Sequence, residues 1–277
     1  MTERRPTAPA EPSRVGRWLP PLTTLLLLLA GWEGYVRAAG VPPYILPAPS
    51  RIVAALVDDA AILLPALGVT LAIAAAALAL AALGGALLAV LFDRSPAISR
   101  SLYPIAVVLQ VTPVIAIAPL IFIYVDSDLV GLLLCAWLVA FFPVLSNATL
   151  GLASADPGLH DVLTVYGASR WQRLRVLLLP AALPAYLAGL RIAGGLALIG
   201  AVVAEYVGGT AGIGSGLAFR ILEAGYRLDI PRMFAALVLL AGAGVAVYGG
   251  LALLTRLLLR RRYGQAEDVG RGRRVQP

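Results

Sequence analysis

The sequence predicts an all-α membrane protein with six transmembrane helices and a cytoplasmic helix-turn-helix loop between spans four and five. Hydrophobic residues make up 60% of the 277 residues and charged residues only 13%. The mean hydropathy is +0.88, which is too high for an ordinary soluble domain. Apolar stretches long enough to cross a bilayer fill most of the chain, and basic residues gather in alternate loops between them.

The N-terminal region predicts a tail, a first span and an extended loop. Residues 1–17 are rich in proline and arginine, so we expect a disordered cytoplasmic tail. Residues 18–39 form the first expected span, which is apolar except for Glu33 and Arg37. A cleaved signal peptide is the alternative, because a basic segment precedes the leucines and small residues follow them. Residues 41–50 contain too many prolines for a helix and predict a rigid outer loop.

Five further apolar stretches predict the remaining spans, over residues 62–92, 103–125, 129–150, 185–207 and 233–259. The third of the six spans is interrupted by Pro113 and Pro119. We expect a short polar loop over 93–100, and a glycine-rich and then charged loop over 208–232. One transmembrane domain therefore extends over 18–262, followed by a cytoplasmic tail over 263–277.

Residues 154–184 form a polar stretch with strong helix signals. Asp156 followed by Pro157 is typical of a helix N-terminus, because the aspartate side chain accepts free N–H groups and proline suits the first helical position. A first short helix is expected to run to about Tyr166. It carries an apolar patch of Val162, Leu163, Val165 and Tyr166.

A turn and a second helix are expected after this first helix. Gly167 tolerates a positive φ, and Ser169 with Gln172 three residues later fits a capping box, which restarts a helix. Pro180 and Pro184 are expected to bound the second helix. This helix carries the arginines Arg170, Arg173 and Arg175.

The placement of arginine predicts the orientation in the membrane. One side of the expected topology collects thirteen arginines and the other collects five. The richer side holds Arg4, Arg5, Arg14, Arg17, Arg94, Arg100, Arg170, Arg173, Arg175, Arg256, Arg260, Arg261 and Arg262. The poorer side holds Arg37, Arg51, Arg220, Arg227 and Arg232. Since cytoplasmic loops carry the excess of basic residues, both termini and the 154–184 loop are expected in the cytoplasm.

The 154–184 loop also resembles a known signature. Gly167, nine further residues and then Leu-Leu-Leu-Pro ending at Pro180 are similar to the EAA loop of the inner-membrane permease subunits of binding-protein-dependent ABC importers. The segments GASRWQ, LPAALPAYLAGLRIAGGLAL and AEYVGGTAGIGSGLA resemble the branch that handles nitrate, taurine, sulfonates and pyrimidine precursors of thiamine. The family's Glu-Ala-Ala stands here as Asp161-Val162-Leu163. The resemblance covers roughly residues 32–262.

This resemblance implies a multi-pass permease of the inner (plasma) membrane. It implies that a separate ATPase subunit, an extracytoplasmic solute-binding protein and a second copy of the chain are its partners. The substrate stays open among a pyrimidine or vitamin precursor, a sulfonate, taurine and nitrate. The implied ATPase-coupling residues are Asp161, Val162, Leu163, Tyr166, Gly167, Ala168, Ser169, Leu177 and Pro180.

Composition narrows the chemistry of the chain itself. All 22 basic residues are arginine, so the lysine of a phosphate-binding P-loop is missing, and ATP is expected on the partner subunit. No cofactor or metal is expected in this chain, where Cys135 is the single cysteine and His160 the single histidine. The net charge of +7 fits anionic lipid at cytoplasmic loops rather than nucleic acid.

Other polar residues suggest further sites. Gln110, Thr112, Pro113 and Pro119 in the third span are candidates for the translocation path, although prolines are also common in membrane helices without such a role. Glu205 is a candidate for an outer gate or ion pair, or else a residue near the interface. The charged residues Arg220, Glu223 and Arg227 are candidates for docking the binding protein, or else a solvated face.

Two other functional classes compete with this interpretation. The first is an intramembrane enzyme, either a serine hydrolase or a lipid-head-group transferase. A hydrolase would need a Ser-His pair, but His160 and Ser215 are predicted on opposite sides of the bilayer, and no dense Asp cluster resembles a magnesium-dependent transferase, so no catalytic residues are assigned. A secondary transporter without an ATPase is the second alternative. Uptake by the chain alone, driven by an ion gradient, would favour it.

Overall fold

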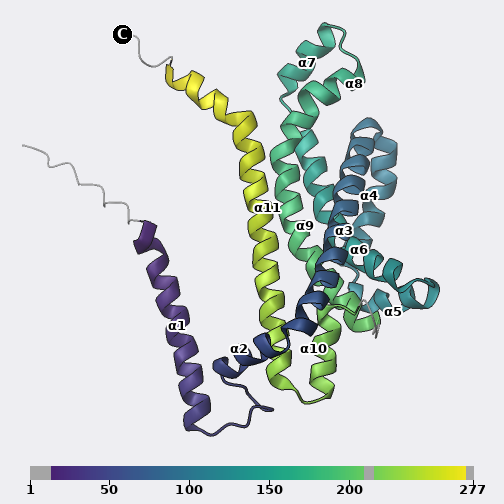
Figure 1. Ribbon diagram of the computed structural model, residues 1–277. Helices are drawn as coiled ribbons and strands as arrows, with labels where there is room; N and C mark the ends of the chain where they lie inside the picture. The colour runs from purple at the N-terminus through teal and green to yellow at the C-terminus, as the bar shows by residue number, and fades with distance from the viewer. Residues whose placement is uncertain (1–13, 209–214, 273–277) are drawn as a thin grey trace, which may run out of the picture.

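The protein is entirely helical in the part of the chain that its computed structural model describes, residues 14–208 and 215–272 (Figure 1). Most of the expected tail over residues 1–17 lies outside these residues, and α1 already begins within it. The described elements are α1 (Arg14–Ala38), α2 (Pro49–Asp58), α3 (Ala60–Arg94), α4 (Pro96–Val111), α5 (Val114–Tyr124), α6 (Asp128–Ala153), α7 (Pro157–Val165), α8 (Arg170–Arg173), a π-helical turn (Leu174–Leu178), α9 (Leu179–Gly208), α10 (Leu217–Tyr226) and α11 (Ile230–Gly272).

Three helices, α3, α6 and α9, pack along one another and form the main core. Most of the buried side chains between them are alanines. At Gly200 on α9, an added Cβ would lie 2.8 Å from the Cα of Ala136 on α6, so only glycine allows this approach. Small residues at such contacts let helices pack closely inside a membrane. Large side chains such as Leu83 and Leu87 instead point outward, 66% and 71% exposed, where lipid can cover them.

Four helices of the described chain are long and apolar enough to cross a membrane. They are α3, α6, the helix that continues from Arg170 to Gly208, and α11 as far as Arg260. The pair α4 and α5 qualifies as a fifth span only if the two helices are taken together, since they are bent by 103°. α1 covers the expected first span but is not among these helices; its sequence includes Pro20, Pro21, Glu33 and Arg37.

The break in the third span occurs at only one of the two expected prolines. α4 ends at Val111, and Pro113 precedes α5. A proline forces the residue before it out of the helical region, and Thr112 is extended here, with φ −76° and ψ 122°. Pro119 lies inside α5 and does not interrupt it.

The expected polar loop over 93–100 is wrong, because a helical hairpin takes its place. α3 continues to Arg94 and α4 begins at Pro96, so a single residue separates them. The Ser95 hydroxyl accepts the N–H of Ile98 at 3.4 Å, which caps α4. The serine and proline thus provide a complete helix start within two residues.

Pro180 and Pro184 do not bound the second helix of the 154–184 loop. The helix continues through both prolines to Gly208. The π-helical turn Leu174–Leu178 ends two residues before Pro180. We attribute the continuity to this wider turn, which accommodates a residue without an N–H, where a proline ring would otherwise clash with the preceding turn.

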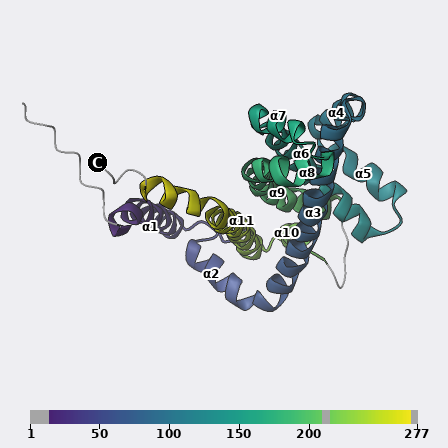
Figure 2. The same cartoon turned by 90° about the horizontal axis from the view of Figure 1, so that it is seen from above.

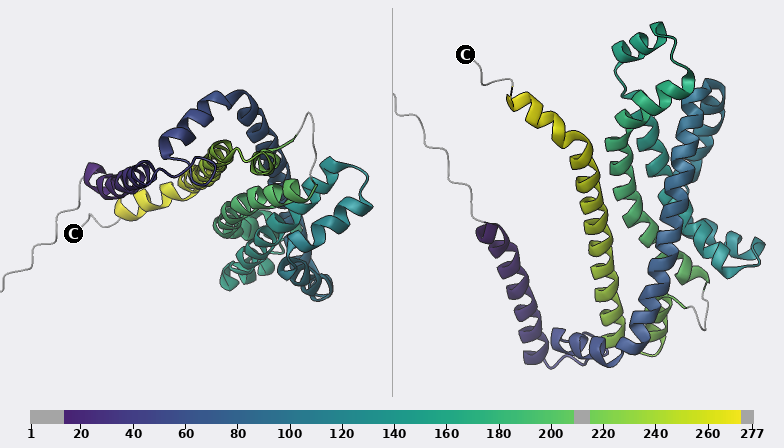
Figure 3. Two further views of the ribbon diagram at one scale, coloured as in Figure 1. Left: turned by 90° about the horizontal axis from the view of Figure 1, so that it is seen from below. Right: turned by 45° about the horizontal axis from the view of Figure 1, so that its top comes forward.

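The elements divide between two ends of the bundle. α7, α8 and the α3–α4 turn lie at the upper end in Figure 1, toward which α1 begins and α11 ends. α2 and α10 lie at the lower end. α1 and α2 form an arm beside the bundle (Figures 2 and 3), and the Trp32 ring of this arm lies 6.0 Å from the Phe234 ring of α11. The expected C-terminal tail over 263–277 is helical as far as Gly272.

Candidate functional site

The first helix of the polar loop, α7, begins where its N-terminal signal predicts. The Asp156 carboxylate accepts the N–H groups of Gly158 at 2.7 Å and Leu159 at 3.3 Å. None of the residues of α7 is buried. Its apolar patch is open, with Val162 50% and Tyr166 85% exposed. A short helix that presents bare apolar side chains beyond the bundle is suited to bind a partner.

The turn between α7 and α8 depends on a glycine. Gly167 adopts a φ of +72°, which L side chains rarely adopt. Nothing lies within 4 Å of a Cβ built there, so the backbone conformation, rather than lack of space, requires glycine. Ser169 then accepts the N–H of Gln172 at 3.2 Å, and the Gln172 side chain accepts the N–H of Ser169 at 2.7 Å. The expected capping box is confirmed.

The other residues of the expected coupling motif are distributed along this loop. Asp161 is exposed, while Leu163 and Ala168 are half-buried. Leu177 is half-buried in the π-helical turn, and Pro180 lies at the second position of α9. The motif therefore extends from the exposed tip of the loop to the start of α9.

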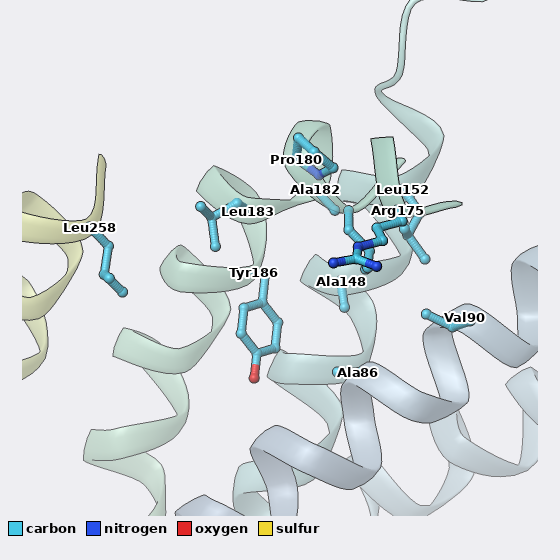
Figure 4. A pocket seen from close by; sticks show the side chains of 11 residues that line it. Ala86, Val90, Ala148, Leu152, Arg175, Pro180, Ala182, Leu183, Tyr186 and Leu258 are labelled. Atoms are coloured by element: carbon cyan, nitrogen blue, oxygen red, sulfur yellow. The ribbon is translucent and has the colours of Figure 1, made fainter. Parts of the chain in front are cut away.

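A cavity of about 510 Å³ lies under the loop, between α3, α6 and α9 (Figure 4). Pro180 and the exposed Arg175 line its upper part, and Tyr186 lies deeper, where its hydroxyl donates to the Ala82 carbonyl at 3.2 Å. The rest of the lining is apolar and includes Leu258 of α11. No local sequence pattern indicates this cavity, because α3, α6, the π-helical turn with α9, and α11 all contribute to it.

A second cavity, of about 300 Å³, lies at the break between α4 and α5. Gln110, Thr112 and Pro113 line it together with apolar residues of α6 and α9, whereas Pro119 does not. The Thr112 hydroxyl donates to the Val108 carbonyl at 2.7 Å, so it is already paired. The break therefore brings three of the four expected path residues to one cavity.

Glu205 is buried, with 1% of its surface exposed, and meets the start of α10. Its Oε2 accepts the N–H of Ala218 at 2.9 Å, and the hydroxyl of Thr70 on α3 accepts the N–H of Leu217 at 2.8 Å. These bonds satisfy two of the N–H groups that a helix start leaves free, and a carboxylate suits the positive end of the helix. Glu205 forms no ion pair within the described residues.

The charged residues considered for docking pair with one another. The Glu223 carboxylate accepts a hydrogen bond from Arg220 at 2.8 Å and forms an ion pair with Arg227 at 2.8 Å. The hydrogen bond from Arg220 holds the pKa of the Glu223 carboxyl below its usual value, and the charge of Arg227 acts in the same direction. Arg227 is two-thirds exposed and stays accessible to a partner.

Sequence reasoning missed an ion pair at the same end. Arg232 of α11 binds both carboxylate oxygens of Asp59, at 2.6 Å and 2.8 Å. These residues are 173 positions apart, and no local pattern connects them. Two acidic residues in succession at Asp58 and Asp59, between apolar helices, were the available signal.

The serine hydrolase alternative has no assembled site. His160 is part of α7, and Ser215 lies directly before α10, so they stand at opposite ends of the bundle (Figure 1). A general base must lie within hydrogen-bond reach of the nucleophile that it activates.

Comparison with known proteins identifies the family. Residues 81–261 match the family described as "binding-protein-dependent transport system inner membrane component". The chain is 33% identical over 242 residues to the formylaminopyrimidine transport permease protein ThiX of Halalkalibacterium halodurans, an alignment that covers 87% of this chain and 95% of the relative. It is 33% identical over 247 residues to the riboflavin transport system permease protein RibX of Chloroflexus aurantiacus, covering 86% and 88%.

A third relative handles a different solute. The taurine transport system permease protein TauC of Escherichia coli is 31% identical over 244 residues, covering 86% of this chain and 84% of the relative. The family match and these near full-length similarities agree with the apolar helices of the described chain. The chain belongs to the binding-protein-dependent inner-membrane components and is a permease subunit of an ABC importer, a multi-pass transport protein of the inner membrane rather than an enzyme.

Proposed function

We propose that α7, Gly167 and α8 form the loop through which an ATPase subunit drives this permease. The observation that carries the proposal is the bare apolar surface of α7, which has no buried residue and follows a complete local cap. ATP is bound by the partner, and closure of two ATPase subunits switches the spans between inward-open and outward-open states. A second copy of the chain completes the translocation path.

The proposed topology has six spans, with both termini and the coupling loop in the cytoplasm. α1 supplies the first span. The arrangement of the helices supports this, because the arginine-rich turn and loops lie toward one end of the bundle and α10 lies at the other (Figure 1). A reporter that is active only outside the cytoplasm should be inactive when fused after Gly158 and active after Asp126. The reverse pattern would contradict the topology.

The coupling role is tested by Gly167→Val, with Gly40→Val as the matched control. Both glycines have a positive φ, +72° and +61°, and neither has an atom within 4 Å of an added Cβ. The two variants therefore bear similar backbone strain, but Gly40 lies between α1 and α2. In vesicles with the ATPase and the binding protein, Gly167→Val should hydrolyse ATP without uptake, whereas Gly40→Val should keep uptake coupled.

Normal coupled uptake by Gly167→Val would contradict the coupling role. An equal loss of coupling in Gly40→Val would also contradict it, because the loss would then come from backbone strain in general and not from the α7–α8 turn. Uptake by the purified chain alone, driven by an ion gradient, would instead support a secondary transporter.

We propose that the solute is a small neutral organic molecule of the pyrimidine or vitamin-precursor kind, delivered by an extracytoplasmic binding protein. The cavity at the α4–α5 break supports this choice, because its lining contains no charged side chain to hold a sulfonate or nitrate. Gln110 supplies an amide that can donate and accept hydrogen bonds. Two relatives are named for formylaminopyrimidine and riboflavin, and a third for taurine.

The substrate class is tested on the binding protein and on the cavity. The cognate binding protein should be stabilised thermally by a pyrimidine compound and not by taurine, sulfonates or nitrate. Gln110→Ala should lower the rate of uptake while the assembled complex stays intact. Stabilisation by taurine, a sulfonate or nitrate would contradict the proposed class.

A further inference from the structure

A third cavity, of about 330 Å³, lies between the end of α3 and the coupling loop. Its volume is about ten times the share of one water molecule in the liquid, so it can hold a polyatomic group. Unlike the two cavities described above, it is lined mainly by charged and polar side chains. The lining residues are Asp93, Arg94, His160, Arg170, Arg173, Leu174 and Leu178.

Positive charge in this cavity exceeds negative charge. Three guanidinium groups face it against one carboxylate. None of these four groups forms an ion pair within the described residues. The Arg94 guanidinium lies 5.5 Å from the centre of the Trp171 ring, a contact that leaves the edge of the guanidinium available for hydrogen bonds.

Arg173 is fixed in place but incompletely satisfied. Its Nη1 donates to the Thr164 hydroxyl at 3.1 Å and lies 3.5 Å from Nε2 of His160. Its Nε is shielded from solvent and has no hydrogen-bond partner. The bond to Thr164 holds the guanidinium in one place beside the cavity, which lowers the entropy cost of binding a ligand there.

We propose that this cavity binds a phosphate-bearing anion through Arg94, Arg170 and Arg173. Guanidinium groups donate in a planar fork that matches phosphate oxygens, and charge-assisted hydrogen bonds of this kind are strong. The anion would connect α3 to α7 and α8, and so hold the coupling loop against the bundle. Free inorganic phosphate and the headgroup of an anionic phospholipid share this chemistry. The inference does not require the proposed coupling to an ATPase.

The test uses the full-length chain in lipid nanodiscs. In nanodiscs of neutral phosphatidylcholine, inorganic phosphate is titrated at constant ionic strength, and binding is followed by hydrogen exchange of residues 160–174. The same exchange is then measured in nanodiscs that contain phosphatidylglycerol. Protection that rises saturably with phosphate identifies the free anion. Protection that appears with phosphatidylglycerol, and that phosphate does not produce in neutral lipid, identifies the lipid headgroup.

Three variants connect the effect to the cavity. Arg173→Gln should weaken binding about tenfold, since a charge-assisted bond contributes about 1.5 kcal/mol or more. Arg170→Gln should weaken it about threefold, because this side chain is exposed. Arg100→Gln on α4 is the control, because it removes an exposed arginine that does not line the cavity, and it should change nothing.

Two results would overturn the proposal. One is the absence of protection with both phosphate and phosphatidylglycerol. The other is an equal loss of binding in Arg100→Gln and Arg170→Gln, which would indicate general attraction by surface charge. Arg170 has no hydrogen bond through its side chain among the described residues, so Arg170→Gln keeps the test valid even if Arg173→Gln fails to fold.

Discussion

The starts of α7 and α10, at opposite ends of the bundle, are held in different ways. α7 is capped by Asp156, whose carboxylate accepts N–H groups two and three residues later. α10 has no local cap at Gly216 and is held by Thr70 and Glu205, 147 and 13 positions away. α7 buries no residue, whereas α10 buries Leu217, Ala218, Ile221 and Ala224. α7 is thus held by its own cap and by the hydrogen bond from Arg173 of α8 to Thr164, while α10 is fixed to α3 and α9.

The largest expected effect tests the long-range anchor of α10, which we define as the hydrogen bonds that Glu205 and Thr70 accept from its first residues. Glu205→Leu should lower the free energy of unfolding by about 3 kcal/mol, because the Ala218 N–H then loses its acceptor in a buried place. Glu205→Gln is the matched control, since it keeps an oxygen acceptor and should cost about 1 kcal/mol. Gly216→Ala should act in the same direction, because its Cβ would overlap the Glu205 carboxylate.

The measurement is the denaturant midpoint in detergent together with hydrogen exchange of α10. Exchange should rise in α10 and stay unchanged in α7. If Glu205→Leu left the exchange of α10 unchanged, the difference between the two helices would not depend on this anchor.

The second effect concerns the ion pair between Arg232 and Asp59. Arg232→Gln should cost about 1–2 kcal/mol, since the pair is bidentate and mostly shielded from solvent, with side chains 23% and 16% exposed. A double-mutant cycle with Asp59→Asn should give a coupling energy of similar size. Strictly additive single effects would mean that the pair does not fix α11 to the α2–α3 junction.

The third effect concerns the local caps at the coupling end. Ser169→Ala should cost about 1 kcal/mol, because it removes one half of the capping box of α8. The loss should appear as faster exchange in α8 and leave α10 unchanged. Ser101→Ala is the control, because the Ser101 hydroxyl only donates to the carbonyl of Ala97 within its own helix. Faster exchange in α10 of Ser169→Ala would show that the two ends are not independent.

The smallest effect is a dependence on pH at the charged cluster of Arg220, Glu223 and Arg227. The pKa of Glu223 is lower in the folded protein than the usual value of a glutamate, first because of the hydrogen bond from Arg220. The contribution of Glu223 to the free energy of unfolding is therefore present above the pKa that this carboxyl has in the unfolded chain. It is lost as the pH falls through the pKa of the folded state. Unfolding midpoints should decrease below pH 4.5 more in the unmodified protein than in Glu223→Gln. High salt should reduce this difference, since the group is partly exposed.

Prediction from sequence succeeded where the signals are local. The caps at Asp156 and Ser169, the positive φ of Gly167 and the break at Pro113 each depend on residues within a few positions. The apolar runs likewise placed the long helices, because the bilayer requires about 20 apolar residues whatever the tertiary contacts.

Prediction failed where distant contacts or an unusual turn determine where a helix begins or continues. The charged loop over 208–232 contains α10, whose start depends on Thr70, a residue 147 positions away. Pro180 stays within a helix because of the π-helical turn before it, which no pattern indicated. The three cavities were also beyond sequence reasoning, since each combines side chains of several elements.

The continuous helix from Arg170 to Gly208 gives the molecule a lever. Its α9 part, Leu179–Gly208, has 30 residues and spans about 45 Å at 1.5 Å per residue, whereas α8 turns away from this axis (Figure 1). Glu205 stands near one end of α9, and the π-helical turn Leu174–Leu178 joins α8 and its capping box to the other end. A rotation of about 5° around one end of α9 would displace its opposite end by about 4 Å. A displacement of α8 can therefore reach α10, at the opposite end of the bundle, through one continuous helix without any intervening loop.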